Sequence, residues 1–267
     1  MSPVEKRIAD CILEEPEKVM NSPLVYVAAR ANVSEGSVIN FSNALGCKGF
    51  SQLKINLAQN VSSYSVQDEV TKEDTPKEIM RKLMNRAAIS FESTYDTIQT
   101  QLQDAAELLL HAGKIVVYGV GPSTAVARDI SICMMRIGLP AIMETDPLLA
   151  AALSTQMGER DVLFAISNSG RTKEILEVAE TAGRSGGKVI CLTSHANSLL
   201  TSLSHVSLVA VSMEAQNHRE AATARLTQLL IGDCLTDFLA NQMMDEAVVN
   251  QDKMAEVYER HREAVHD

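Results

Sequence analysis

From Lys114 onward, short apolar runs alternate with stretches of helical spacing, and this alternation limits the possible folds more than any other feature. The runs are KIVVYG, LPAIM, DVLFAIS, KVICLT and HVSLVAV. Strands that are separated by helices in this way form a parallel sheet with helices on both faces. We therefore expect an α/β domain with three α/β/α layers in this part of the chain.

The first 60 residues show helical spacing instead. Val4, Ile8, Cys11 and Ile12 recur at intervals of three and four, which predicts an amphipathic helix with one buried face. Pro16 and Pro23 interrupt the pattern. The run LVYVAARA after Pro23 predicts a second helix, and the segment NVSEGSVINFSNALG predicts a turn followed by a third.

The third helix has recognisable ends. The hydroxyl of Ser34 can cap its first turn, and Gly46 suits a left-handed stop at its last. Apolar residues between positions 50 and 60 predict one more helix. The N-terminal part should therefore be an all-α domain.

A polar segment, residues 61–74, follows and reads as a linker. Thr75, Pro76 and Glu78 then form the sequence of a capping box, which predicts a helix that runs into the nineties. Helical spacing appears again at 101–112 and from about 221 to 265. Because domains commonly contain about 100–200 residues, a chain of 267 residues fits two of them.

The composition is that of an ordinary globular protein, with 46% apolar and 22% charged residues. No apolar run approaches the roughly 18 residues that would cross a bilayer, and the first ten residues have no apolar signal core, so we expect a cytoplasmic protein without membrane contact. The five cysteines and six histidines show no metal-ligand spacing. We predict reduced thiols, no metal and no cofactor.

The net charge of −10 disfavours nonspecific binding to nucleic acid, which depends on Lys and Arg. That charge lies entirely beyond residue 60, because residues 1–60 contain six basic and six acidic side chains. The N-terminal domain is therefore neutral, and nucleic acid stays a possible partner for it.

Two loops follow predicted strands and precede predicted helices. In the first, Gly119-Val120-Gly121-Pro122-Ser123-Thr124, the third glycine of a dinucleotide fingerprint is absent, and Pro122 removes an amide. This loop can hold a phosphate at a helix N-terminus, or it can be an ordinary tight turn.

The second loop, residues 167–172 with the sequence SNSGRT, carries the stronger signal. Its hydroxyls and amides at a helix N-terminus form a neutral, donor-rich site for a phosphate dianion. The same residue types also serve as caps and turns, which is the alternative interpretation. Thr193 and Ser194, at a third strand end, can line the same crevice.

The pairing of GVGPS with SNSGRT resembles the sugar isomerase (SIS) domain, over roughly residues 100–240. The resemblance implies a five-stranded parallel sheet whose loops hold a sugar phosphate. It implies that the phosphate-binding residues are Ser123, Ser167, Asn168, Ser169, Gly170 and Thr172. Further sugar contacts are expected at Gly121, Glu214 and His218.

The N-terminal sequence EKRIADCILEEPEKV, followed by VAARANVSEGSVINFSNALGCKGFSQLK, resembles the helix-turn-helix head of RpiR-type transcription regulators. Glu214, Arg225 and Asp233 also match residues that such regulators carry. The resemblance implies a regulator of sugar or amino-sugar metabolism genes that is controlled by a phosphosugar. The expected domains are a helix-turn-helix head (1–62), a linker and connecting helix (63–99), a SIS domain (100–240) and a C-terminal helix (241–267).

The chain departs from the family at two places. The segment 34–44 has no basic residue, and Asn40, Ser42 and Asn43 occupy the expected recognition surface. Base reading then depends on neutral donors. We predict that the residues contacting operator DNA are Ser34, Ser37, Asn40, Asn43, Lys48 and Lys54. The second departure is Pro147, which stands where many relatives have a histidine near the sugar.

Two alternatives stay open at this stage. The head can be a dimerisation element without DNA contact, and a homodimer or tetramer is expected in either case. The chain can also be a phosphosugar isomerase, which needs a base beside the substrate carbonyl. The candidate bases are Glu214, Glu220, His195 and His218. We favour the regulator because an isomerase has no use for a helix-turn-helix head.

Overall fold

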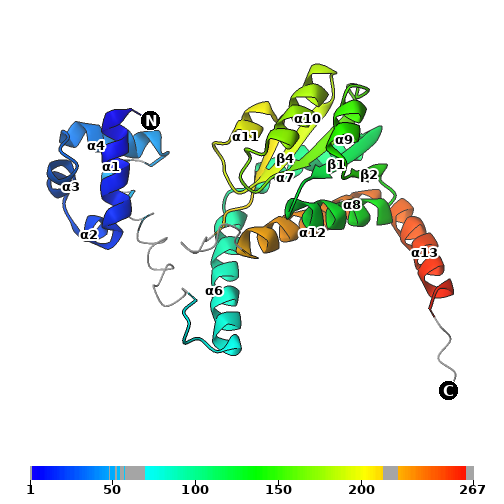
Figure 1. Ribbon diagram of the computed structural model, residues 1–267, viewed down its shortest axis with the longest axis horizontal. Coiled ribbons are helices and arrows are strands. Elements are labelled where there is room, and N and C mark those ends of the chain that lie inside the picture. Colours follow the sequence, from blue (N-terminus) through cyan, green and yellow to red (C-terminus); the bar gives the residue numbers. More distant parts are fainter. Residues whose placement is uncertain are drawn as a thin grey trace. The chain divides into compact units, whose positions relative to one another are not determined.

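A computed structural model describes residues 2–47, 49–51, 53, 54, 57, 70–212 and 222–262. The chain divides into two compact units, Met1–Glu73 and Asp74–Asp267. Figure 1 draws both units, and each is described here by itself. In the described parts of both, no helix is long and apolar enough to cross a membrane.

The first unit is helical, as the sequence predicts. Its helices are α1 (Pro3–Glu14), α2 (Pro16–Asn21), α3 (Leu24–Arg30) and α4 (Glu35–Ala44). Ser2 and Glu5 form a capping box at the start of α1. The buried faces of these helices share one core, which includes Ile8, Val27, Val38 and Phe41. The helix α2, between the two prolines, is an element that the sequence did not predict.

The second unit contains a five-stranded parallel sheet in the order β2-β1-β3-β4-β5. The strands are β1 (Lys114–Gly119), β2 (Ala141–Glu144), β3 (Asp161–Ile166), β4 (Lys188–Thr193) and β5 (Val206–Val209). Five of the six residues in each of the three central strands are buried, because helices cover both faces. The fold class predicted from the apolar runs is confirmed.

Helices form the two outer layers of this unit. One face of the sheet packs against α7 (Gln99–Leu110), α8 (Ser123–Arg136) and α12 (Ala222–Met243). The other face packs against α9 (Pro147–Ser154), α10 (Lys173–Arg184) and α11 (Leu199–Leu203). Figure 1 shows α10 and α11 on one side of the sheet and α8 and α12 on the other.

Two further helices complete the second unit. The helix α6 (Pro76–Tyr95) begins with the expected capping box of Thr75 and Glu78, and it packs against α12. The helix α13 (Asp245–Arg260) follows α12 after Met244, whose φ is 41°. The predicted C-terminal helix of residues 241–267 therefore corresponds to the end of α12 plus α13 within the described residues.

Candidate functional site

A pocket of about 270 Å³ opens at the carboxyl ends of β1 and β3. Both predicted loops contribute to it, together with the first turns of α12. Its lining residues are Val120, Pro122, Ser123, Val126, Asn168, Ser169, Thr172, Ala222, Ala224, Arg225 and Gln228. The pocket lies where parallel α/β sheets commonly bind ligands, since strand ends and helix starts meet there.

Two helices begin at this pocket, and neither has a side-chain cap. The N-cap of α8 is Pro122, and the N-cap of α10 is Thr172, whose hydroxyl makes no capping bond. By contrast, Asp146 caps α9 and Ser198 caps α11. Among the described residues, no side chain caps the first turn of α8 or of α10, and the positive ends of both helix dipoles favour an anion at the pocket.

The predicted phosphate residues fall into two groups. Ser123, Asn168, Ser169 and Thr172 line the pocket. Ser167 is 1% exposed instead, and its Oγ lies 3.1 Å from Thr172 Oγ1 and accepts a hydrogen bond from the Gly170 amide. Ser167 thus stabilises the turn through contacts with Thr172 and Gly170, and its role as a phosphate ligand stays a prediction.

Gly170 is the tightest point of this loop. Its φ is +60°, and a Cβ built on it would overlap the Oγ and Cβ of Ser198. Its carbonyl also accepts a hydrogen bond from the Leu200 amide. Only glycine fits this left-handed position beside α11, so the residue sets the loop's shape.

Asn168 connects three elements around the pocket. Its Oδ1 accepts a hydrogen bond of 2.7 Å from the Ser194 hydroxyl and one of 3.5 Å from Gln228 Nε2. Its carbonyl oxygen accepts from Thr193 Oγ1. Thr193 and Ser194 therefore support the second loop from the end of β4, and they are not among the lining residues.

Of the other predicted sugar contacts, only Gly121 lies among the described residues. Gly121 has a φ of +57° in the first loop, and it is exposed and absent from the pocket lining. Glu214 and His218 lie outside the described residues, as does Glu220. His195 is exposed, and its Nδ1 lies 3.0 Å from the Asn168 carbonyl oxygen.

The α12 wall of the pocket was largely missed by sequence reasoning. Arg225 was noted only as a family match, and Gln228 was not singled out. Gln228 is 2% exposed, which is unusual for a glutamine, and its amide reaches the pocket loop. The available signal was its helical spacing with Ala224, Ile231 and Leu235, which places it on the same buried face.

In the first unit, α3 and α4 are joined by a tight turn. The Val33 amide donates to the Ala28 carbonyl across Asn32, whose φ is 52°. Ser34 then caps α4 by accepting from the Ser37 amide at 3.2 Å, as predicted. After α4, Gly46 has a φ of +80°, and this confirms the predicted stop.

The polar residues of α4 do not all face solvent. Ser34, Asn40 and Asn43 are exposed, and Ser37 is partly exposed. Placing Ser42 on the recognition surface was wrong, because its side chain is buried and its hydroxyl donates to the Val38 carbonyl. Ile39, which is 38% exposed, lies on this helix instead and was overlooked.

Several cations of the first unit interact with its own residues. Arg30 lies within 4 Å of the carboxylates of Glu14 and Glu15. Lys54 Nζ donates to the Ser22 carbonyl and lies 5.6 Å from the centre of the Phe50 ring. Lys48 lies outside the described residues. The predicted DNA contacts of Lys48 and Lys54 stay predictions.

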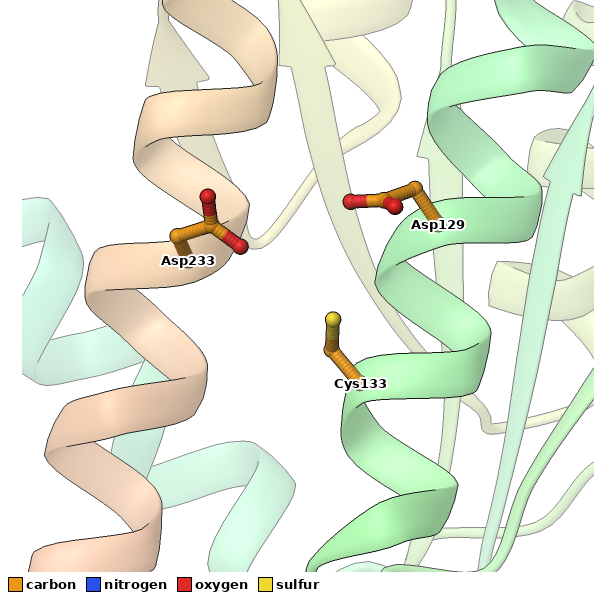
Figure 2. Close-up of side chains that lie close together, drawn as sticks. All are labelled: Asp129, Cys133 and Asp233. Atoms are coloured by element: carbon orange, nitrogen blue, oxygen red, sulfur yellow. The ribbon is translucent and has the colours of Figure 1, made fainter. Parts of the chain in front are cut away.

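One group in the second unit has the residue types of a metal site. Asp129 and Cys133 of α8 and Asp233 of α12 place their ligand atoms within 4.8 Å of one another, and Figure 2 shows the three side chains pointing toward a common space. Burial raises the pKa of the Cys133 thiol, and the Asp129 and Asp233 carboxylates raise it further. Spacing along one helix can bring Asp129 and Cys133 together, but it cannot show that Asp233 of another helix joins them.

Comparison with known proteins agrees with both units. Residues 1–64 match the model of the helix-turn-helix domain of the rpiR family, and residues 108–236 match the SIS domain. The solved structure of the Vibrio vulnificus NanR protein complexed with ManNAc-6P is 29% identical, with a TM-score of 0.68, and the match covers 99% of this chain and 96% of that one.

Two kinds of relative are similar to this chain in sequence. An uncharacterised HTH-type transcriptional regulator of Caldanaerobacter subterraneus subsp. tengcongensis is 32% identical, over 96% of this chain and 92% of that protein. The bifunctional protein glk of Burkholderia orbicola is 32% identical over 88% of this chain. The match spans only 37% of the length of that bifunctional protein.

A helical head with a capped helix-turn-helix, followed by a parallel sheet with an anion-suited pocket, defines a two-domain protein of the helix-turn-helix and SIS class. The matches cover nearly the whole chain. The chain belongs to the RpiR family of helix-turn-helix regulators.

Proposed function

We propose that this protein is a transcription regulator whose head binds operator DNA and whose SIS domain binds a phosphorylated sugar that controls that binding. The observation that carries the proposal is the meeting of two uncapped helix N-termini, those of α8 and α10, at one pocket with hydroxyl side chains. Such a site binds a phosphate dianion through neutral donors, and it does so reversibly.

In this proposal the phosphate binds between Ser123 of the first loop and Ser169 and Thr172 of the second. The sugar ring then extends toward α12, where the Arg225 guanidinium and the Gln228 amide can donate to its hydroxyl or acyl oxygens. Because a relative was solved with ManNAc-6P, we propose an amino-sugar 6-phosphate as the first ligand class to test.

For the head, we propose that α4 enters the major groove with its first turns toward the bases, as in other helix-turn-helix proteins. Ser37 and Asn40 then donate to base edges, and Ile39 can contact a thymine methyl group. Because the segment 34–44 has no basic residue, we expect one head alone to bind weakly and two heads to bind together. We therefore propose a homodimer or tetramer that acts on operator DNA in the cytoplasm.

An isomerase remains the competing function, since the sequence offered Glu214, Glu220, His195 and His218 as bases. What supports the regulator is the head, because residues 1–64 match the helix-turn-helix domain of the rpiR family and an isomerase has no use for such a head. Aldose-ketose interconversion needs a base next to the reacting carbons. Of the four candidate bases, His195 lies among the described residues, and its Nδ1 lies 3.0 Å from the Asn168 carbonyl oxygen. We propose binding without turnover.

The ligand is best found by thermal shift with a panel of hexose, amino-sugar and pentose phosphates. A ligand at 100 times its Kd stabilises the native state by about 2.7 kcal/mol, which is readily seen as a higher Tm. The best compound is then titrated into an anisotropy assay with the operator DNA. Absence of any stabilising phosphosugar, or sugar turnover by the purified protein, would contradict the proposal.

A matched pair of variants tests the site. Thr172→Val removes a hydroxyl from the pocket, while Thr181→Val makes the same change on the same helix, α10, away from it. A hydrogen bond to a charged group is worth about 1.5–3 kcal/mol, so Thr172→Val should weaken sugar binding by roughly 10- to 150-fold. Thr181→Val should leave the affinity unchanged. Equal affinities for both variants would show that the site is elsewhere.

A further inference from the structure

The helix α6 buries an arginine whose guanidinium lacks a counter-charge in the described parts of the chain. Arg86 is 7% exposed, and its Nε has no hydrogen-bond partner among the residues that the structure describes. No ion pair joins its guanidinium to a described carboxylate either. Arginines are almost never buried to this extent unless they are paired. The missing counter-charge must therefore come from outside this set of residues.

An unpaired buried cation is unstable, and a guanidinium cannot relieve the strain by losing its proton. Taking a charged group out of water costs free energy that only an opposite charge and good hydrogen bonds offset. A buried lysine or histidine can lower this cost by becoming neutral, whereas an arginine keeps its charge. An anion beside the guanidinium of Arg86 is the direct way to offset the cost.

No carboxylate of α6 lies within one turn of Arg86 along the helix. Neighbours on a helix face are three and four residues apart. At those distances from Arg86 the sequence has Lys82, Leu83, Ile89 and Ser90. Nearer the start of the helix, Asp74 forms a salt bridge of 2.8 Å with Lys82, and Glu78 belongs to the capping box. The helix α6 thus supplies no counter-charge for Arg86.

The helix that packs against α6 adds positive character instead. The helices α6 and α12 are in contact, and Figure 1 shows the first turns of α12 beside α6. Over residues 222–232, α12 contains no Asp or Glu, and its fourth residue is Arg225. The N-terminal end of a helix also carries about half a positive charge. The two packed helices therefore favour an anion between them.

The contact between these helices is polar but otherwise uncharged. We define the α6–α12 seam by the residues buried on α6, which are Arg86, Ala87, Ser90 and Thr94, and by those buried in the first two turns of α12, which are Thr223, Ala224, Thr227 and Gln228. The hydroxyls of Ser90 and Thr227 donate to carbonyl oxygens of their own helices. The Nε of Arg86 therefore remains as a donor for a ligand.

We propose that Arg86 is the centre of a binding site for a small oxyanion, a phosphate or a carboxylate, at the α6–α12 seam. A guanidinium presents parallel N–H groups whose spacing matches two oxygens of such an anion. The positive end of α12 adds to the attraction. This site is separate from the sugar pocket, because Arg86 is not one of the residues that line that pocket.

An oxyanion at this place would hold α6 against the sheet domain. The end of α6 is already fixed, since Thr94 Oγ1 accepts a hydrogen bond of 3.0 Å from the Val211 amide after β5. Arg86 lies about two turns earlier, where the oxyanion would join α6 to α12. Binding to the native state raises its stability by mass action. The site needs neither sugar nor DNA, so its test is independent of the proposed function.

The first experiment is calorimetric titration of the full chain with inorganic phosphate in a zwitterionic buffer of low ionic strength. Because the sugar pocket can also bind phosphate, every protein carries Ser169→Ala and Thr172→Val, which remove two hydroxyls from that pocket. We expect this background protein to bind phosphate saturably. Adding Arg86→Met should weaken the binding by about tenfold or more, since a hydrogen-bonded ion pair is lost.

The matched control is Arg81→Met, because Arg81 is an exposed arginine of the same helix. In the background protein it should leave the affinity for phosphate unchanged. If the background protein binds no phosphate, or if Arg86→Met binds it as tightly as the control does, the proposal fails.

Thermal unfolding of the same proteins separates a lost ligand from a damaged fold. Without phosphate, Arg86→Met should have a Tm at least as high as that of the background protein, because it removes an uncompensated charge. Phosphate should then raise the Tm of the background protein and of Arg81→Met, but not that of Arg86→Met. If Arg86→Met is less stable in both buffers and phosphate changes no Tm, the chain itself neutralises the guanidinium, and the proposal is wrong.

A crystal of the wild-type chain grown with selenate tests the site without any variant. Selenate is a tetrahedral oxyanion like phosphate, and anomalous scattering locates its selenium. We expect a selenate within hydrogen-bond distance of Arg86, whether or not another occupies the sugar pocket. An adventitious ion only, bound elsewhere on the surface with none at Arg86, would overturn the proposal.

Discussion

Replacing Gly170 by alanine should damage the pocket loop more than any other single methyl group added to it. The residue has a φ of +60°, where an L-amino acid costs about 1–2 kcal/mol relative to glycine. The new Cβ would overlap Ser198 Oγ and Cβ and lie 3.1 Å from Thr193 Oγ1. Crowding of this kind typically costs about 1–3 kcal/mol more, because side chains and backbone must shift.

The two contributions together predict a loss of about 2–5 kcal/mol in the free energy of unfolding of the second unit. For a domain of roughly 150–250 residues, each kcal/mol lowers the Tm by about 2–4 °C, so the expected drop is roughly 4–20 °C. Any part of the strain that the loop relieves by moving will displace Ser169 and Thr172. Sugar affinity should then fall together with stability.

The assay is thermal unfolding followed by near-UV circular dichroism, combined with sugar titration by calorimetry. Gly183→Ala is the matched control, because this glycine lies in α10 with no atom within 4 Å of an added Cβ. The control should raise the free energy of unfolding by about 0.5–1 kcal/mol through helix propensity. A Tm for Gly170→Ala within 1–2 °C of the wild type would refute the reasoning, since roughly 1 kcal/mol or less would then be involved.

A second change separates strain from collision. Ser198→Gly removes the atoms that an alanine at 170 would meet, and glycine at an N-cap costs only a few tenths of a kcal/mol. The double variant should regain the stability that Gly170→Ala loses through steric overlap. Only the cost of the left-handed backbone should then remain. A double variant that is as unstable as Gly170→Ala would mean that the steric assignment is wrong.

Three smaller predictions concern other parts of the chain. Ser34→Ala should destabilise the head by about 1 kcal/mol, whereas Ser34→Asn should keep the cap, and chemical denaturation of the head measures both. Tyr118→Phe should raise the free energy of unfolding by about 1 kcal/mol, because the buried Tyr118 hydroxyl has no hydrogen-bond partner among the described residues. A free energy of unfolding that is about 1 kcal/mol lower in Tyr118→Phe would refute this. Burial, and secondarily Lys188, lower the pKa of His205, whose Nδ1 accepts from the Val189 amide. As the pH falls, the unfolded state therefore takes up the proton first. This contribution to stability is complete above a pH of about 6.5 and is lost as the pH falls through the lowered pKa. Urea titrations at pH 5–7 should show that the free energy of unfolding depends less on pH in His205→Gln than in the wild type.

The layers of the second unit could be predicted because their signals are local. A strand buried on both faces is a continuous apolar run, and all five runs became strands of the sheet. The caps at Ser34 and Thr75 could also be predicted, since a hydroxyl, its partner amide and the helix start lie within four residues.

Other features depend on contacts that no local pattern shows. The helix α2 begins at Pro16, and a proline can either end a helix or begin one. The break between α12 and α13 occurs at Met244, whose positive φ is not announced by a glycine. Ser42 looked like a surface residue because its type is polar, yet its hydroxyl bonds within its own helix.

The pocket also combines features that local sequence predicts with features that only the fold reveals. Both predicted loops could be found in the sequence because glycine, serine and threonine follow strands there. The third wall is made by α12, and Gln228 lies 60 residues after Asn168 in the sequence, so only the fold brings the two together. Whether Ser167 faces a ligand or holds the turn likewise depends on the direction of one side chain, which composition cannot give.

The position of α12 limits how a sugar could control DNA binding. The helix supplies the third wall of the pocket and packs against α6, and Leu226, Leu230 and Phe238 are exposed on it. The helix α6 begins only a few residues after the boundary with the first unit. A ligand that binds two arrangements equally shifts neither, so the sugar must bind one arrangement of α12 and its neighbours more tightly. A tenfold difference in affinity amounts to about 1.4 kcal/mol, which is within what one hydrogen bond to a charged group supplies. Under the proposed function, contacts made by Arg225 and Gln228, rather than those of the loops alone, would couple sugar binding to the heads.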